Sequence, residues 1–512
     1  MKDMKTLYKI FSAVAAIVVL ASCNLDRIPY GSMVYDENVS AIQKASDLTA
    51  FENGINVYFR SLHQTTYYYV GDLMTDGFNA QSDFGNNFGP LHRTDADFTA
   101  SDQDIEDVWG GYYVAINKFN IGIAATDAIE DEELKEAAQV FKGECLFYRA
   151  ACYLYLARYF GKYYDPATAA NDLSVPLVTV YDQQARPARE TQENVYKQIK
   201  ADLDAAAEIL ADVPGAVRAN RPTIDAVNAL YARYYLDVQD YEKAAEKAQA
   251  VIDTKLYTLC STDEAFAAEY VDDAGTEPIL QMYASLKEQP NSLSAYTGLT
   301  TFNKKDCYSP FFLPSGKLID AYDAGDLRLK NWFKASGDAS YPIRMQGTLH
   351  SNPAVLVFTK FEGNPVYENN NRTLGRQAIK PFRIGEMYLI AAEALFKAGK
   401  PIDANNILNE LQTARGAALT GTPALVDIQN EWFKETVGEG QRYWCLKRWG
   451  LGFTARYAQP GAVAEGLLAT GDYYAARTME ASDYHFNLPI PNYEIQINNN
   501  LRQNAGYDKI AQ

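Results

Sequence analysis

The chain has 512 residues, of which 47% are hydrophobic and 22% are charged, a composition close to that of ordinary globular proteins. Its 65 Asp and Glu residues outnumber 47 Lys and Arg residues, which gives a formal charge of −18 at pH 7. This charge argues against a nucleic-acid-binding protein, which needs a basic face to displace counterions, and against electrostatic docking on anionic lipid.

The first 23 residues have the pattern of a bacterial lipoprotein signal. Three lysines precede an uncharged, mostly apolar run over residues 10–20, which is too short to span a bilayer but suits a signal-peptide core. The run ends in Leu20-Ala21-Ser22-Cys23, where small residues before a cysteine resemble a lipobox. We predict that residues 1–22 are removed and that Cys23 carries the lipid. The alternative is a secretory signal with an incidental cysteine.

Most of the remaining chain is predicted to be helical, because apolar residues recur every three to four positions. The helices expected first in chain order are 104–130, 134–160 and 191–211. Four further helices form two pairs, 223–238 with 241–252 and 384–398 with 401–414. In each pair a short turn joins helices that carry alanines at helical spacing, which is typical of a tetratricopeptide unit. Such units stack to bury their faces, so we predict a mainly α fold built on tetratricopeptide-like helical pairs.

Residues 255–380 interrupt the helical pattern with clusters of Gly, Pro, Asn and Ser and with short strand-like runs such as 354–358. We expect an irregular, loop-rich lobe inserted in the helical scaffold, and residues 62–100 have a similar composition. The predicted organisation is a signal peptide at 1–22, an N-terminal helical region at 23–254, the loop-rich lobe at 255–380 and a C-terminal helical region at 381–512. Loops on a rigid frame are where binding residues tend to lie.

The sequence contains no motif that predicts catalysis, a cofactor or a metal centre. Its four histidines are scattered, and it has neither a nucleophile elbow nor a phosphate-binding loop. Asp102, Asp104 and Glu106 alternate as in a calcium loop. Asp107 stands where that loop needs Gly, so we interpret these carboxylates as the first turn of a helix. Carboxylate pairs for glycoside hydrolysis are too common in an acidic chain to be judged from sequence alone.

Five cysteines follow Cys23, at positions 145, 152, 260, 307 and 445. Their odd number and the absence of any CxxC spacing argue against a disulfide framework or a metal site. We predict buried thiols that act as small hydrophobic residues.

Several motifs remain, and they follow one another along almost the whole mature chain. They are Trp109 with Tyr112-Tyr113; Gly143-Glu144-Cys145-Leu146-Phe147-Tyr148-Arg149-Ala150; Pro187-Ala188-Arg189-Glu190-Thr191; Pro314-Ser315 with Asp326-Leu327-Arg328; Arg383-Ile384-Gly385-Glu386 with Ala392-Glu393-Ala394; Glu439-Gly440 with Arg448-Trp449-Gly450; and Leu488-Pro489-Ile490-Pro491 with Gln503-Asn504. In this order, together with the lipobox, they resemble the SusD/RagB family of outer-membrane nutrient-binding lipoproteins. Trp432 and Cys445 depart from the family, which often has Arg and Asp at these positions.

The resemblance implies a function as well as a fold. Members of the family are tied by lipid to the cell surface. They work with a SusC-like TonB-dependent transporter barrel in the outer membrane, over which they close as a hinged lid. They capture an oligomeric nutrient, usually a glycan and in some members a peptide, and they are not enzymes. The first hypothesis is a glycan-binding subunit of an importer, the second an oligopeptide-binding subunit, and the third a surface glycosidase or a structural lipoprotein.

A glycan site needs aromatic rings for the flat C–H faces of the sugar and planar polar groups for its hydroxyls. Residues 62–93 combine Tyr, Phe, Asp and Asn in a predicted loop, and Trp332 is the one tryptophan outside the family motifs. We predict that the ligand contacts Tyr67, Tyr68, Asp76, Asn79, Asp83 and Trp332. The alternative is a tyrosine-rich edge that packs on the scaffold. Arg383, Glu386 and Glu393, on an alanine-rich helix, are expected to form buried ion pairs instead.

Overall fold

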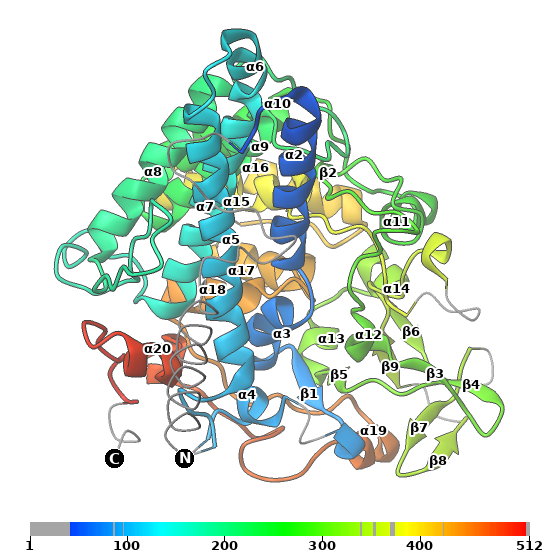
Figure 1. Cartoon of the computed structure of the whole chain (residues 1–512). Helices are drawn as coiled ribbons and strands as arrows, with labels where there is room; N and C mark the ends of the chain where they lie inside the picture. Colours follow the sequence, from blue (N-terminus) through cyan, green and yellow to red (C-terminus); the bar gives the residue numbers. More distant parts are fainter. Residues whose placement is uncertain are drawn as a thin grey trace, which may run out of the picture.

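The computed structural model describes residues 41–84, 88–95, 97–337, 340–351, 355–368, 374–422 and 424–507. The predicted signal peptide and Cys23 lie outside the described residues. Within them, no helix combines the length and the apolar character that crossing a membrane requires. Helices occupy the left and top of Figure 1, and the loop-rich lobe lies at the lower right.

The α-helices are α2 (Ala45–Ser61), α3 (Thr66–Leu73), α4 (Gly89–Arg93), α5 (Gln103–Asp127), α6 (Glu132–Ala137), α7 (Gln139–Phe160), α8 (Gln192–Ile209), α9 (Ile224–Asp237), α10 (Tyr241–Asp253), α11 (Asp263–Tyr270), α12 (Ser294–Thr297), α13 (Gly316–Asp320), α14 (Leu327–Trp332), α15 (Ile384–Lys397), α16 (Pro401–Arg415), α17 (Leu425–Glu435), α18 (Gln441–Trp449), α19 (Ala462–Leu467) and α20 (Asn492–Ile497). The short 3-10 helices are η1 (Ser82–Phe84), η2 (Pro365–Tyr367) and η3 (Tyr484–Phe486). The strands are β1 (Phe78–Ala80), β2 (Pro278–Leu280), β3 (Leu299–Phe302), β4 (Lys305–Tyr308), β5 (Phe312–Pro314), β6 (Phe333–Ala335), β7 (Ile343–Met345), β8 (Thr348–His350), β9 (Leu356–Phe358) and β10 (Phe382–Arg383).

The mainly α fold and all the predicted helices are confirmed, with one break. The helix predicted at 134–160 is divided at Ala138 into the short α6 and the long α7. Side-chain caps fix several starts: Thr191 accepts the N–H of Asn194 at α8, and Thr223 accepts the N–H of Ala226 at α9. Such caps satisfy backbone donors that have no partner inside the helix.

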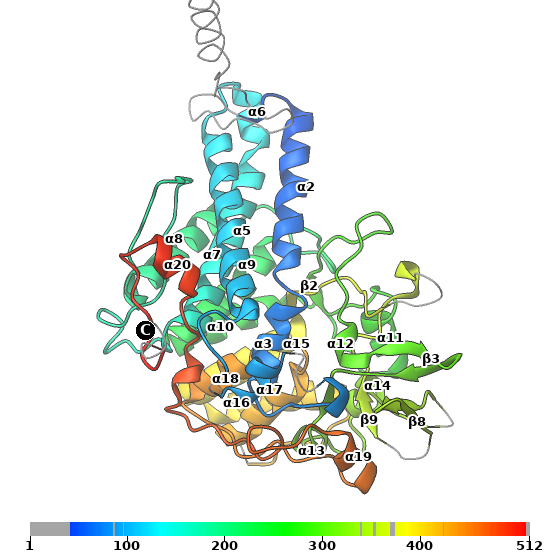
Figure 2. The same cartoon turned by 60° about the horizontal axis from the view of Figure 1, so that its bottom comes forward.

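The helices pack in pairs, as the tetratricopeptide-like pattern predicts. α9 packs on α10 and α15 on α16, and α10 lies against α15 although the whole lobe separates them in sequence (Figures 1 and 2). Fully buried alanines on α9, among them Ala226, Ala229 and Ala232, allow this close approach. The long α7 packs between α5 and α8. One continuous apolar core therefore runs through the scaffold.

The lobe is built from short strands and short helices. Strands β3, β4, β7 and β8 form a four-stranded sheet in that order, and β6 pairs with β9. Two further pairings, β1 with β5 and β10 with β2, connect the lobe to segments of the helical regions. The lobe has its own apolar clusters, to which α3 and α17 contribute side chains. The domain boundaries stay a prediction, since these pairings cross them.

The five cysteines of the described chain are all buried, as predicted. Cys145, Cys152, Cys260 and Cys445 are free thiols. Burial raises the pKa of each of these four thiols, which keeps them protonated and unreactive.

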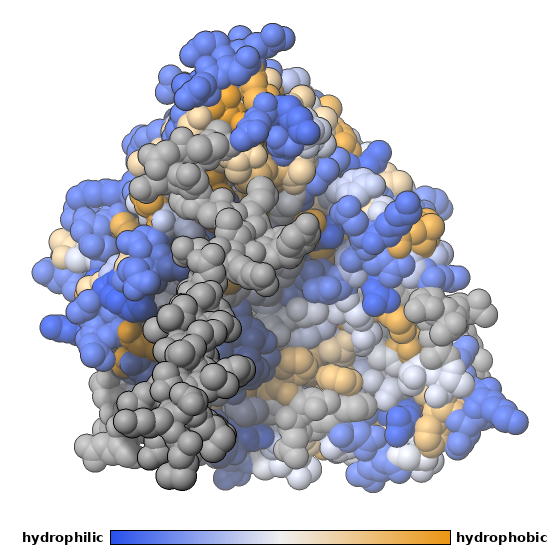
Figure 3. All heavy atoms as spheres, viewed as in Figure 1, coloured by the Kyte–Doolittle hydropathy of each residue, from blue (hydrophilic) through white to orange (hydrophobic). Residues whose placement is uncertain are grey.

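The face seen in Figure 3 is largely hydrophilic, with apolar residues in small groups.

A buried ionic network joins α14 of the lobe to β10, α16 and α17. Glu435, on α17, accepts hydrogen bonds from Arg328 (2.9 Å), Arg383 (3.3 Å) and Arg415 (2.7 Å). Glu277 also pairs with Arg415 at 2.7 Å and with Arg383 at 3.1 Å. Buried charges of this kind are stable only when their partners are in place.

The three charged residues expected to be structural on the alanine-rich helix are paired inside the protein. Arg383 belongs to the network above. Glu386 pairs with Arg233 of α9 at 2.5 Å, and Glu393 pairs with Arg448 of α18 at 2.8 Å. All five side chains are buried or nearly so, which confirms the prediction that Arg383, Glu386 and Glu393 form buried ion pairs.

Candidate functional site

An open groove lies where α2 ends, α3 begins and α5 passes them, and both views show these three helices side by side (Figures 1 and 2). Its volume is about 450 Å³, within the range of small-ligand sites. The lining residues are Ser61, Thr65, Thr66, Tyr67, Glu106, Asp107, Gly110, Gly111 and Asn291. The groove therefore offers one aromatic ring, three hydroxyls, two carboxylates and one amide to a ligand.

Tyr67 forms the aromatic wall of the groove. Its ring packs edge-on against Tyr112, with 5.3 Å between centroids, and its hydroxyl donates to the backbone oxygen of Asp107 at 3.3 Å. Gly111 makes this contact possible, because a Cβ at that position would lie 1.8 Å from the Tyr67 hydroxyl. Burial, together with the charge of Asp107, raises the pKa of Tyr67, so the phenol stays neutral. The ring is half-buried, held on one side and open to the groove on the other.

Thr65 gives the groove a strained backbone at the start of α3. Its φ of 52° and ψ of −127° fall in a region that glycine tolerates and a β-branched residue rarely adopts. A residue held in such a conformation costs of the order of 1–3 kcal/mol and persists where its surroundings enforce it. Strain of this kind is concentrated at functional sites, and here it sits on the groove wall.

Carboxylates occupy the α5 side of the groove. Asp102 caps α5 by accepting the N–H of Asp104 at 3.1 Å, which confirms the interpretation of this acidic run as a helix start. Thr66, on the opposite wall, donates to Asp104 at 3.3 Å. Burial, reinforced by the charges of Asp102 and Asp107, raises the pKa of Asp104 to about 7. In the described part of the chain, no group of three or more His, Cys, Asp or Glu side chains is placed to hold a metal ion.

Comparisons with known proteins place this fold in a family. A family model described as the SusD family matches residues 316–507, and one described as starch-binding and associating with the outer membrane matches residues 33–236. The chain belongs to the SusD/RagB family. The starch-binding protein SusD of Bacteroides thetaiotaomicron is 25% identical over 490 residues, covering 81% of this chain and 80% of that protein. SusD-like protein P2 of Formosa agariphila is 26% identical over 424 residues, covering 76% and 77%.

Solved structures agree with the family assignment. A SusD superfamily protein from Bacteroides thetaiotaomicron superposes with a TM-score of 0.72 at 25% identity, covering 90% of this chain and 99% of that one. The surface glycan-binding protein A of Bacteroides fluxus superposes with a TM-score of 0.65 at 19% identity, covering 91% and 100%. The second likeness, at its low identity, establishes the fold alone. The resemblance predicted from the motifs is thereby confirmed.

Three of the six ligand contacts predicted from sequence are wrong for this conformation, because their side chains are buried among internal partners. Trp332 is fully buried on α14, between Phe266 and Tyr270, with ring centroids 5.7 and 5.3 Å away. Asn79, on the buried strand β1, donates to the backbone oxygen of Arg456. Neither side chain is accessible to a ligand.

Asp76, the third of these residues, is fully buried and binds Arg442 at 2.8 Å and Lys317 at 2.7 Å. Burial on its own would raise the pKa of Asp76, but the two cations outweigh it and hold the pKa well below its usual value. Asp76 is therefore a structural ion-pair partner that ties the turn before β1 to α13 and α18, and the prediction that it binds sugar hydroxyls is corrected.

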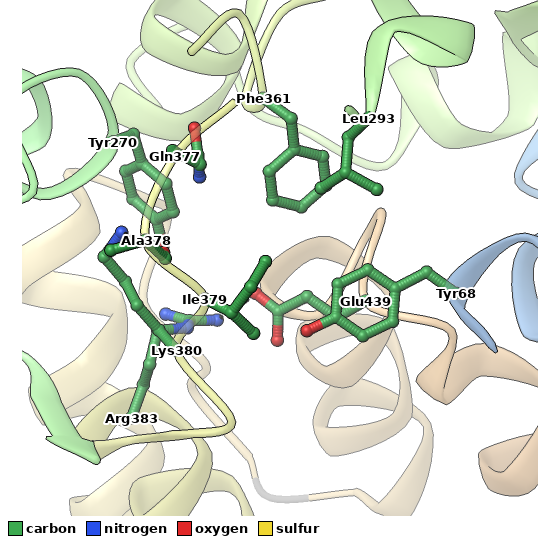
Figure 4. Close-up of a pocket in the computed structure, with 10 residues that line it drawn as sticks. All are labelled: Tyr68, Tyr270, Leu293, Phe361, Gln377, Ala378, Ile379, Lys380, Arg383 and Glu439. Carbon is green, nitrogen blue, oxygen red and sulfur yellow. Dashed lines mark hydrogen bonds and ion pairs between the residues drawn. The ribbon is translucent and has the colours of Figure 1, made fainter. Parts of the chain in front are cut away.

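The other predicted residues lie apart from one another. Tyr68 points from α3 toward the interior, where it lines two narrow cavities of about 20 and 30 Å³ beside Lys380 and Glu439 (Figure 4). Cavities of this size hold water molecules rather than a sugar. Asp83 is exposed but bonds through both carboxylate oxygens to the backbone N–H of Gln346, in the β7–β8 turn. Of the six residues, Tyr67 alone lines the open groove.

The remaining groove residues were missed because they come from four separate segments of the chain. One signal in the sequence pointed to them. Gly110 and Gly111 stand together in the middle of a long predicted helix, where each glycine lowers helix stability by about 1 kcal/mol. A glycine kept at such a cost indicates close approach by another group, which here is the Tyr67 hydroxyl.

The buried carboxyl of Asp72, one turn beyond Tyr68 on α3, makes stability depend on pH. Burial raises its pKa to about 7, against the opposing effect of the hydrogen bond from the Tyr296 hydroxyl. The folded state then binds more protons than the unfolded chain between pH 4 and 7, so the free energy of unfolding falls as pH rises through that window. We expect Asp72→Asn to gain stability relative to the wild type between pH 5 and pH 8, measured by chemical denaturation. Parallel stability–pH curves for the two proteins would contradict this assignment.

Proposed function

We propose that this protein binds an oligosaccharide in the groove at Tyr67 and passes it, as a lipid-anchored lid, to a TonB-dependent outer-membrane transporter. The observation that carries the binding proposal is the composition of the groove, where one aromatic wall faces hydroxyls, an amide and carboxylates. Membership of the SusD/RagB family supports it, since the relative from Bacteroides thetaiotaomicron is named a starch-binding protein.

The chemistry of the groove suits a sugar ring. The flat face of Tyr67 matches the C–H face of a pyranose and is already fixed by its contacts with Tyr112 and α5. Sugar hydroxyls both donate and accept hydrogen bonds. Glu106 and Asp107 accept from them, while Asn291 and the threonine hydroxyls both donate and accept.

Binding fits the arrangement better than cleavage does. Retaining and inverting glycosidases place two carboxyl groups on opposite sides of the bond that they break. Glu106 and Asp107 are adjacent residues of α5, and both line the groove from the side of that helix. The two carboxylates therefore serve one wall of the groove, and we propose that they orient a ligand that leaves intact.

Removing the aromatic wall is the direct test. We expect Tyr67→Ala to weaken glycan binding by about 1–2 kcal/mol, or about ten-fold, because one stacking ring is lost from a shallow site. Tyr67→Phe keeps the ring and loses only the hydroxyl, so its affinity should stay within about three-fold of the wild type. The ligand is found on a glycan array that includes maltooligosaccharides, and affinity is then measured by calorimetry.

The matched control is Tyr473→Ala, which removes an exposed tyrosine from the C-terminal segment, 45% exposed and outside the groove. Its affinity should equal that of the wild type. If Tyr67→Ala folds normally and binds the glycan as tightly as Tyr473→Ala does, the site is elsewhere. If no glycan binds and peptides co-purify, the oligopeptide hypothesis replaces the glycan hypothesis.

Anchoring and delivery are tested together. From detergent-solubilised outer membranes we expect the wild-type chain to co-purify with a TonB-dependent barrel, and we expect mass spectrometry to find lipid at Cys23. Cys23→Ala should remain unlipidated and leave the membrane fraction when the barrel is deleted. Recovery of lipidated wild-type chain without any barrel, from cells that contain the barrel, would count against the lid.

A further inference from the structure

We propose that the Tyr67 groove selects glycans by charge, accepting units that are neutral or carry an amine and excluding units that carry a uronate or a sulfate. The inference rests on the proposed function, since it assumes that the groove binds a glycan. It is carried by the placement of carboxylates around the groove and by the lack of any basic residue in the part of its lining that the structure describes.

The lining itself is acidic. Among the described residues that line it, the charged ones are Glu106 and Asp107, and both are negative. Asp107 is exposed and Glu106 half-exposed, so their carboxylates face solvent and an incoming ligand. An anionic group on a sugar would meet two like charges and no compensating cation in this space. In small-ligand sites that bind carboxylates or sulfates, arginine or lysine usually supplies that compensation.

The surroundings add further carboxyl groups, of which Asp104, with a pKa of about 7, carries only part of its negative charge at neutral pH. Asp102 and Asp104 lie at the start of α5 directly beside the groove, where Asp104 accepts the hydroxyl of the lining residue Thr66. The raised pKa of Asp104 has burial as its main cause and the charges of Asp102 and Asp107 as further causes.

The nearest arginine on α2 is already engaged away from the groove. Arg60, next to the lining residue Ser61, donates to the backbone oxygen of Tyr283 and faces Glu288 at 3.7 Å. Lys118 is on α5 seven residues beyond Gly111, about 10 Å along the axis, and its ammonium lies over the ring of Tyr58. These two cations are thus held by other partners, and the groove keeps its negative charge.

The size of the effect follows from Coulomb's law. A ligand carboxylate within about 5 Å of both lining carboxylates is repelled strongly enough, even in a largely aqueous site, to bind about ten-fold or more weakly than its neutral counterpart. An ammonium at the same place is attracted to a similar degree. Both effects shrink as salt is added, because the groove is open to solvent.

The first experiment uses a glycan array with matched backbones, each present as neutral, amine-bearing, uronate-bearing and sulfated forms. The wild-type chain should bind neutral or amine-bearing members, and their anionic counterparts should bind at least ten-fold more weakly. The double variant Glu106→Gln/Asp107→Asn should reduce this difference in affinity between neutral and anionic glycans to about two-fold. The control Glu208→Gln/Asp212→Asn removes the same charge from exposed positions at the end of α8 and should leave this difference unchanged.

The second experiment measures the charge of the groove without any glycan. Asn291→Cys, in a chain that also carries Cys23→Ala, places one exposed thiol on the wall, while the five other cysteines are buried. The introduced thiol is modified with a cationic and with an anionic methanethiosulfonate reagent. The rate for each reagent is divided by the rate at which the same reagent modifies free 2-mercaptoethanol, which removes the difference in intrinsic reactivity. The normalised ratio should favour the cationic reagent about ten-fold and should fall toward one in the Glu106→Gln/Asp107→Asn background.

The two experiments separate failure of the inference from failure of the proposed function. A thiol-rate ratio near one, or uronate- and sulfate-bearing glycans that bind as well as neutral ones and are lost in Tyr67→Ala, would overturn charge selection and leave glycan binding in place. A chain that binds no glycan but captures lysine- or arginine-rich peptides would overturn the glycan proposal, together with the inference drawn from it.

Discussion

Glu435→Gln is expected to destabilise the protein by about 3–5 kcal/mol, the usual effect of removing one partner from a buried ionic network. The carboxylate is fully buried and is shared by three guanidinium groups, those of Arg328, Arg383 and Arg415. A glutamine keeps the shape but removes the negative charge, so three buried cations lose their common partner. Chemical denaturation at neutral pH measures the loss.

The control is a charge pair of the same kind on the surface. Lys330 and Asp263 form an ion pair in which both side chains are exposed, so Asp263→Asn should leave the free energy of unfolding nearly unchanged. Equal losses in Glu435→Gln and Asp263→Asn would show that the buried network adds no more than a surface pair does.

The network has a consequence for the groove as well. Its arginines join the lobe at α14 to the scaffold at β10 and α16, and the lobe also supplies Asn291 to the groove wall. If the network loosens, the lobe loses its fixed place against α2 and α5. We therefore expect Glu435→Gln to weaken ligand binding in addition to stability, although Glu435 touches no part of the groove.

The helices were predictable because their signal is local. Apolar periodicity over residues 223–252 or 384–414 reports which face of each helix is buried, and the alanines report how closely the partner helix packs. The pairing of α10 with α15 was predictable only through the repeat, since neighbouring units of one kind stack.

The candidate site was predictable only in part, because accessibility depends on packing between distant segments. Trp332 and Asp76 have the chemistry of ligand contacts, but Trp332 fills the core of the lobe and Asp76 pairs with Arg442, which lies 366 positions away. No local pattern distinguishes such residues from exposed ones. Tyr67 lies in the Tyr-, Asp- and Asn-rich segment that the sequence singled out, and it lines the groove, whereas no pattern in the sequence pointed to Asn291.

Gly71→Ala is expected to lower stability by about 1–3 kcal/mol and to weaken ligand binding, because α3 has no room for one added methyl group. A Cβ at Gly71 would lie 1.9 Å from the backbone oxygen of Gly440, the residue that precedes α18. The position of the added Cβ is fixed by the backbone of α3 and the atoms that it meets are backbone, so no side-chain rotation relieves the clash. α3 must move away from α18, and it carries Tyr67 with it.

Gly54→Ala is the matched control, since it adds the same methyl group to the middle of α2, where no described atom apart from the helix's own backbone and the adjoining residues lies within 4 Å of it. There the substitution should stabilise the protein by about 0.5–1 kcal/mol, because alanine is the better helix former. Thermal melts and calorimetry with the bound glycan compare the two variants. If Gly71→Ala keeps wild-type stability but binds poorly, α3 has shifted at little cost. If it keeps both stability and affinity, the close packing of α3 on α18 does not position Tyr67, and the groove owes its shape to the contact of Tyr67 with Gly111 on α5.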